Sequence, residues 1–163
     1  MHCIQALIAG METLADMPRV VPSAVICPLA QGLGLVPITE AVEAELGASD
    51  HARPDPSVPP AAGMVAGVAS LAATLSATGP VVYVATEFFG GDGVQDALVW
   101  RDGALVLQVG SKEDNAEPWP DSPISRALRH IGVTAFDESD EFDALGLGAH
   151  RDNDSWAQAQ APR

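Results

Sequence analysis

Four polar side chains near the middle of the chain have the residue types needed for acid–base or metal chemistry. Glu87 follows a run of apolar residues, and Asp92, Gln95 and Asp96 come soon after it. Two or three carboxylates brought together bind a divalent cation or act as a general acid and a general base. The same groups equally serve as structural hydrogen-bond acceptors, for loop amides or for Arg101 or Arg151. The sequence leaves both interpretations of Glu87 open.

The other residues that could carry chemistry form no recognised motif. The histidines are His2, His51, His130 and His150, which lie far apart and show no zinc-type spacing. The glycine-rich segment at residues 90–93 lacks the lysine of a phosphate-binding loop. We therefore predict no bound metal and no cofactor, and favour a protein that is not an enzyme. The competing interpretation is a small enzyme or ligand-binding protein that uses Glu87, Asp92 and His150.

The two cysteines point to a reducing environment. Cys3 and Cys27 lie in apolar, strand-like segments, which favours buried free thiols over a disulfide. The first residues also lack the basic start and the cleavage site of a secretory signal, and they are typical of a strand at residues 2–9. These features predict a cytoplasmic protein.

The polar residues around Glu87 are positioned by strands that the pattern defines well. Residues 81–88 are apolar on both parities, which is typical of a central strand covered on two sides. Asp102 and Gly103 predict a tight type I′ turn between strands at residues 94–101 and 104–109. A two-residue loop then pairs Arg101 with Ala104, Trp100 with Leu105, and Leu98 with Leu107.

Helix signals occur on both sides of these strands. The expected helices are at residues 11–17 with Pro18 ending the helix, at 39–46 with Thr39 as the cap, within 60–77, at 122–131 before Gly132, and from near Ser139 with Phe142 and Leu145 as anchors. Short strands are expected within residues 20–38, with a turn at Gln31 and Gly32. Residues 56–86 carry no charge, but Pro59, Pro60, Gly79 and Pro80 break the segment and exclude a membrane helix.

These elements predict an α+β fold with a mainly antiparallel sheet of about five strands and helices packed on one face. At 163 residues the chain fits a single domain, which we expect over residues 1–151. Residues 152–163 are expected to form a polar C-terminal tail that frays.

Negative charge is the strongest signal in the composition. The formal net charge is −14, and residues 87–163 hold fifteen of the 22 acidic residues. Such a chain repels nucleic acids and anionic membranes and attracts a basic protein partner, although charge also serves solubility alone. We expect the C-terminal acids to gather on one side of the molecule. The predicted partner-binding residues are Glu87, Asp92, Asp96, Asp137, Glu138, Asp140, Glu141 and Asp143, with Trp156 in a polar loop as an aromatic anchor or a cover for the sheet edge.

Three segments of the C-terminal half carry a resemblance. They are EFFGGDGVQDALVW at residues 87–100, SPISRALRHIGV at 122–133 and DEFDALGLGAHRDNDSW at 140–156. Together they resemble small bacterial immunity-type proteins encoded beside polymorphic toxins. The resemblance implies a non-enzymatic protein that neutralises a basic toxin domain by occlusion. A structural subunit without a discrete site is a third interpretation.

Overall fold

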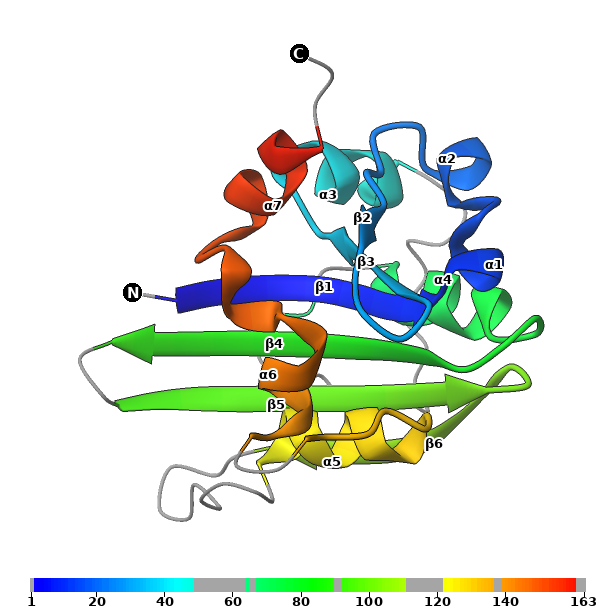
Figure 1. Cartoon of the computed structure of the whole chain (residues 1–163). Helices are drawn as coiled ribbons and strands as arrows, with labels where there is room; N and C mark the ends of the chain where they lie inside the picture. The colour runs from blue at the N-terminus through cyan, green and yellow to red at the C-terminus, as the bar shows by residue number, and fades with distance from the viewer. Residues whose placement is uncertain are drawn as a thin grey trace.

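A single antiparallel sheet forms the centre of the molecule (Figure 1). The computed structural model describes residues 2–48, 64, 67–89, 92–110, 122–136 and 139–160, without the side chains of residues 89 and 92. Its six strands have the order β2-β3-β1-β4-β5-β6. They are β1 (His2–Gly10), β2 (Cys27–Pro28), β3 (Leu33–Pro37), β4 (Val81–Phe89), β5 (Asp92–Arg101) and β6 (Ala104–Gly110). The α+β class is confirmed, with six strands where about five were expected.

Helices occupy the connections and the C-terminal part of the chain. They are α1 (Met11–Leu14), α2 (Met17–Val20), α3 (Glu40–Gly47), α4 (Val68–Leu75), α5 (Pro123–His130), α6 (Glu141–Leu145), the 3-10 helix η2 (Leu147–Ala149) and α7 (Asn153–Ala159). Thr39 caps α3 as predicted, because its hydroxyl accepts a hydrogen bond from the Val42 amide at 3.4 Å. Pro18 was expected to end a helix, but it lies in the first turn of α2, where a missing amide donor costs nothing.

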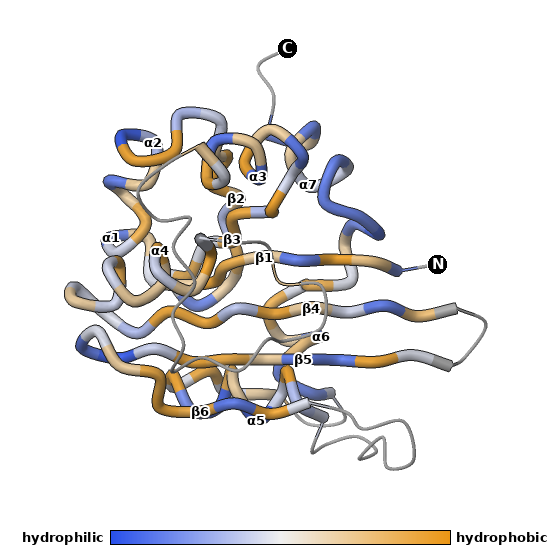
Figure 2. Tube along the Cα trace, turned by 180° about the vertical axis from the view of Figure 1, so that it is seen from behind, coloured by the Kyte–Doolittle hydropathy of each residue, from blue (hydrophilic) through white to orange (hydrophobic). Residues whose placement is uncertain are grey.

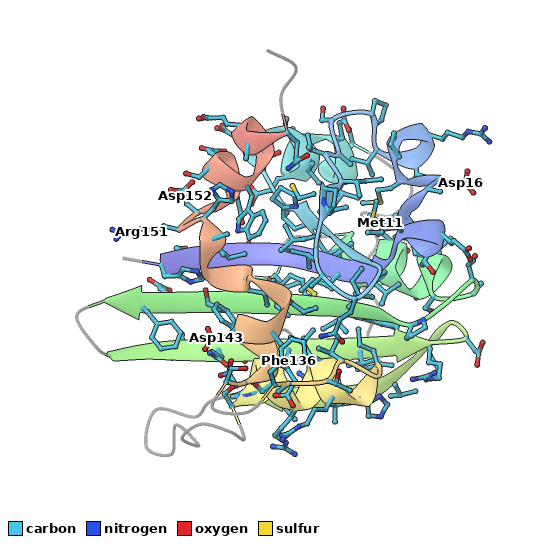
Figure 3. All side chains as sticks on the ribbon, viewed as in Figure 1. Met11, Asp16, Phe136, Asp143, Arg151 and Asp152 are labelled. Atoms are coloured by element: carbon cyan, nitrogen blue, oxygen red, sulfur yellow. The ribbon has the colours of Figure 1, made fainter. Side chains whose placement is uncertain are left out.

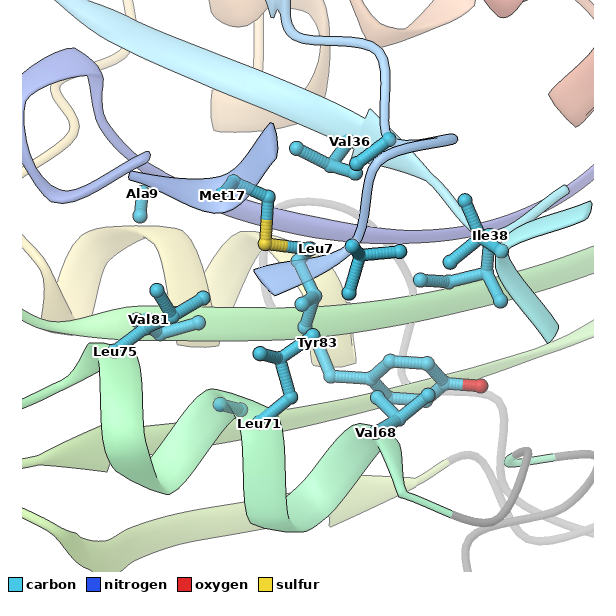
Figure 4. Packing of buried hydrophobic residues seen from close by; sticks show 14 of the residues in the cluster. Leu7, Ala9, Met17, Val36, Ile38, Val68, Leu71, Leu75, Val81 and Tyr83 are labelled. Carbon is cyan, nitrogen blue, oxygen red and sulfur yellow. The ribbon is translucent and has the colours of Figure 1, made fainter. Parts of the chain in front are cut away.

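Helices cover both faces of the sheet, which corrects the prediction that they pack on one face. On one face, Leu71 and Leu75 of α4 pack with Leu7, Tyr83 and Trp100 in a hydrophobic cluster, part of which Figure 4 shows. On the other face, α5, α6 and α7 contribute Ile124, Leu128, Leu145 and Trp156 to a second cluster with Ile8 and Val84. The physical reason is in β4, whose apolar residues point to both faces and would otherwise meet water. We refer to these as the α4 face and the α5 face.

The hairpin between β5 and β6 confirms the predicted turn and corrects part of the register. Asp102 and Gly103 both have positive φ angles, 51° and 81°, as a type I′ turn requires. Arg101 pairs with Ala104 and Trp100 with Leu105, as predicted. A bulge then shifts the register, so that Leu107 pairs with Val99 and not with Leu98. The shift moves Leu107 to the α5 face, where it packs against the second cluster.

The C-terminal segment is a folded element and not the frayed tail that was expected. The backbone carbonyl of Arg151 accepts a hydrogen bond from the Cys3 amide at 2.8 Å, so this segment runs beside the start of β1. Asp152 caps α7 by accepting from the Ser155 amide at 2.7 Å, and this bond holds the pKa of Asp152 below its ordinary value. Trp156 is only 4% exposed. Residues 152–160 therefore belong to the domain.

Candidate functional site

Three neighbouring strands form a regular grid of side chains on the α4 face. Going along β4, the first two rows are Ala9–Val81–Trp100 and Leu7–Tyr83–Leu98, and the next two are Gln5–Ala85–Asp96 and Cys3–Glu87–Val94. The first two rows are buried beneath α4 and its neighbours. The last two rows, called here the polar rows, carry Gln5, Asp96 and Glu87 and lie at the edge of the apolar cluster, which still includes Ala85. Figure 2 shows the corresponding hydrophilic bands on β1, β4 and β5.

The polar rows enclose a hollow. Its lining consists of Cys3, Gln5, Ala85, Thr86, Glu87, Val94 and Asp96, and its volume is about 120 Å³. Ala85 lies at the centre of its row, and its small side chain leaves the space between Gln5 on β1 and Asp96 on β5. Glu87, which is exposed, and half-buried Asp96 bring two carboxylates to the same hollow. None of the described residues that line it is basic.

Neither carboxylate is paired with a cation from the described residues. Within the described part of the chain, no hydrogen bond or ion pair joins Glu87 or Asp96 to a cation. Arg101, one of the two arginines considered for Glu87, donates to the His130 carbonyl at 3.3 Å instead. Burial raises the pKa of Asp96 above its ordinary value, because the ionised form loses hydration there. As far as the described residues show, the hollow is therefore rich in acceptors and contains no positively charged side chain.

Tyr83 lies one row before Ala85 on the same face of β4 and is not among the residues that line the hollow. The residue is fully buried, and its hydroxyl has no hydrogen-bond partner among the described residues. Figure 4 shows the hydroxyl pointing past Val68 and away from Val81, which is the direction of Ala85 along β4. Burial raises the pKa of Tyr83, and the negative charges of Asp96 and Glu43 raise it further. All three effects favour the protonated hydroxyl.

The predicted acidic surface is divided between the two faces of the sheet. Asp140 caps α6 and Asp143 lies within it, and Leu145 of this helix packs on the α5 face. Glu87 and Asp96 instead line the hollow on the α4 face. Figure 3 also places Asp16 on the opposite side of the molecule from Asp152. Asp137, Glu138 and the Asp92 side chain lie outside the described residues. The described acids therefore do not gather on one side, because consecutive elements pack on different faces.

Two predicted partner-binding residues are buried and serve the fold. Glu141 is 5% exposed, and its carboxylate lies 3.6 Å from the Arg129 guanidinium. Trp156 lies in α7 and not in a polar loop, and it packs in the cluster on the α5 face. Neither side chain is available to a partner. For Trp156, the alternative role of covering the sheet matches its position.

The structure does not assemble the catalytic group of Glu87, Asp92 and His150 from its described side chains. His150 packs edge-on against Trp156, with ring centroids 4.7 Å apart, and Trp156 belongs to the other face. Gln95 also lies on the α5 face, where its side chain accepts a hydrogen bond from the Ile124 amide at 3.3 Å. Among the residues with described positions, no three His, Cys, Asp or Glu side chains are arranged to hold a metal ion.

Sequence reasoning missed the β1 side of the hollow. Cys3 and Gln5 were assigned to a strand, but their place beside Glu87 depends on the pairing of β1 with β4. Alternation along β4 does predict that Ala85 lies on the same face as Glu87. The partner strand and its register are long-range facts that no local pattern contains. Both cysteines are free, as expected, but only Cys27 is buried, whereas Cys3 is half-buried.

Comparisons with known proteins supply no assignment. This chain matches no protein-family model, no curated protein and no solved structure. In the parts of the chain with described positions, no helix has the length and apolar character needed to cross a membrane. Any function must therefore be argued from the hollow and from the charge.

Proposed function

We propose that this protein is an acidic binding module for a basic protein partner, and that the hollow on the α4 face is its contact site. The observation that carries the proposal is that Glu87 and Asp96 line one open hollow, and that no cation is found among the lining residues whose positions are described. Two carboxylates without a countercharge attract a positively charged group, and the net charge of −14 accelerates its approach.

The size of the hollow favours a protein side chain over a small-molecule substrate. Its volume is about 120 Å³. Pockets that enclose drug-sized ligands measure roughly 300–1,000 Å³. One side chain fits such a space, and the surrounding protein surface then provides the rest of the contact. The size therefore argues against the competing interpretation of a small enzyme centred on Glu87.

The finer form of the proposal is an immunity protein that neutralises a basic toxin by occlusion. It is supported by the resemblance of residues 87–100, 122–133 and 140–156 and by the acidic charge. Occlusion needs a rigid acidic surface and no catalytic group. The hollow meets this requirement, since it lies on three paired strands of the sheet.

The test uses the basic domain encoded beside the gene, purified and titrated with this protein at low and high salt. We expect a complex whose association slows as salt rises. The double variant Glu87→Gln with Asp96→Asn should bind more weakly than Asp140→Asn with Asp143→Asn, which removes the same charge from the other face. Equal effects of the two pairs would contradict the hollow as the contact site. If no neighbouring gene encodes a basic domain, or if no complex forms, the toxin form of the proposal is wrong.

A further inference from the structure

The two edges of the sheet differ in how well they are protected against pairing with another chain. β2 forms one edge with only two residues, and one of them is Pro28, which has no backbone donor. β6 forms the other edge, and Figure 2 shows it as the outermost strand beside α5. It has seven residues, Ala104–Gly110, and none of them is charged or a proline. β6 is therefore the edge at which another strand can be added.

The outer side of β6 is open over the described part of the chain. There, β6 pairs with β5 alone, and no backbone hydrogen bond reaches its other side. Val106 is 43% exposed, and Ala104, Gln108 and Gly110 are exposed as well. Alternate residues of an edge strand direct their N–H and C=O groups away from the sheet. These groups offer a row of hydrogen bonds to an extended segment.

Asp96 brings a carboxylate to this open edge. It pairs with Gly110 across β5 and β6, and its Oδ1 lies only 2.5 Å from the place that a Cβ atom on Gly110 would take. The carboxylate thus extends over the glycine toward the outer side of β6. A residue opposite Gly110 on an added strand would lie about 4.8 Å beyond it, which a lysine or arginine side chain spans. Asp96 can therefore bind a basic side chain on that strand.

We propose that β6 accepts an extended segment of the basic partner, which pairs antiparallel with residues 107–110 and places a lysine or arginine opposite Gly110. This inference rests on the proposed function and states how the partner reaches the carboxylate of Asp96. Leu107 and Val109 pack on the α5 face, so apolar residues are expected opposite them. The positions between them face the α4 side and suit polar or basic residues.

The bulge in β6 argues against a second copy of this chain as the occupant. Leu105 packs on the α4 face and Leu107 on the α5 face, although they are only two residues apart. A two-fold axis at the middle of β6 would pair Ala104 with Gly110, and these residues face opposite sides of the sheet. Two copies with a net charge of −14 each also repel one another. A basic segment has neither disadvantage.

The test titrates the isotope-labelled whole protein with the peptide Ac-Thr-Arg-Val-Thr-Val-Thr-NH2 and follows the backbone amides by NMR. We expect saturable shifts at residues 107–110 and at Asp96, with peptide-to-β6 backbone contacts in the antiparallel pattern. The same peptide with glutamate in place of arginine should bind at least about tenfold more weakly. The peptide Ac-Thr-Arg-Pro-Pro-Pro-Thr-NH2 keeps the charge but lacks three backbone donors, so it should cause no saturable shift.

Two glycine variants separate the position of the carboxylate from the overall charge. A Cβ atom in Gly110→Ala displaces the Asp96 carboxylate from the edge, so the arginine peptide should bind about tenfold more weakly. Gly47→Ala is the matched control and should bind like wild type, because a Cβ atom there meets no described atom within 4 Å. Asp96→Asn should weaken binding about tenfold as well, and it keeps the test decisive if Gly110→Ala does not fold.

Shifts that avoid β6, or equal binding of the proline peptide, would overturn the proposal. Changes at β6 that grow with protein concentration in the absence of peptide would indicate a second copy and would also overturn it. The basic domain of the preceding test separates the two proposals. If that domain binds without protecting the amides of residues 107–110 from exchange, the proposed function stands without strand pairing. If the peptide pairs with β6 but the domain does not bind, the proposed function is wrong and the edge remains a site for basic segments. If neither binds, both are wrong.

Discussion

The side chain of Asn153 holds the C-terminal segment against β1, and removing it should destabilise the domain. Its Oδ1 accepts from the Gln5 amide at 3.0 Å, and its Nδ2 donates to the Ile38 carbonyl at 2.8 Å. These bonds lie where β1 continues beyond its last paired residue on β3, so the two backbone groups have no strand partner there. Asn153 therefore supplies the two hydrogen bonds that a neighbouring strand would otherwise make to these backbone groups.

The expected effect of Asn153→Ala follows from these two hydrogen bonds. Each bond contributes about 1 kcal/mol, and more when its remaining partner is left unsatisfied in a partly buried position. We expect the free energy of unfolding to fall by about 2–3 kcal/mol. Urea denaturation measures this change, with Gln158→Ala on the exposed side of α7 as a matched control that should stay within about 0.5 kcal/mol of wild type.

A local readout distinguishes loss of this contact from a general loss of stability. The Cys3 amide donates to the Arg151 carbonyl in the same segment, so the Cys3 and Gln5 amides should exchange with solvent faster in Asn153→Ala than amides of β5. A variant as stable as wild type, with unchanged exchange at these two amides, would refute the structural role given to Asn153.

Two other substitutions test the hollow and the core. Burial raises the pKa of Asp96 above its ordinary 3.8, so the folded state binds this proton more tightly than the unfolded state. Stability contributed by Asp96 is therefore lost as the pH rises from the ordinary to the raised pKa. In urea denaturation at pH 7, Asp96→Asn should be more stable than wild type. This gain in stability should disappear at a pH below the ordinary pKa, and a variant less stable than wild type at pH 7 would contradict the reasoning. Trp156→Ala should lose about 3–5 kcal/mol and Trp156→Phe much less, and a loss below about 1 kcal/mol for alanine would contradict its burial in the core.

Local patterns predicted the elements of this fold well where one physical signal dominated. The positive φ angles of Asp102 and Gly103 and the cap at Thr39 follow from residue chemistry over a few positions. Gly132, with φ 94°, ends α5 for the same reason. The apolar residues at both odd and even positions of β4 also indicated that both faces of the sheet are covered. The predicted architecture nevertheless placed helices on only one face.

The errors arose where distant segments meet. The bulge moves Leu107 to the α5 face, where Leu107 packs against the second cluster. The sequence of the hairpin alone carries no information about this distant packing partner. The segment from Asp152 is polar, yet Trp156 and Asn153 attach it to β1 and to the core. Asp152 followed three residues later by Ser155 is a helix-capping pattern. The polar composition of the segment nevertheless favoured the prediction of a tail. The hollow likewise required the register of β1 on β4.

The charge state of Asp96 separates a structural role from a binding role. A carboxylate retained for the fold has a hydrogen-bonding partner, and its replacement by asparagine lowers stability. Asp96 has no such described partner and is half-buried, so the folded state is less stable for keeping it ionised. A residue that destabilises the free protein and strengthens binding shows the balance between stability and function that is common at binding sites. Asp96→Asn should therefore gain stability and lose affinity for the basic partner together, and a variant that loses both would indicate a structural role.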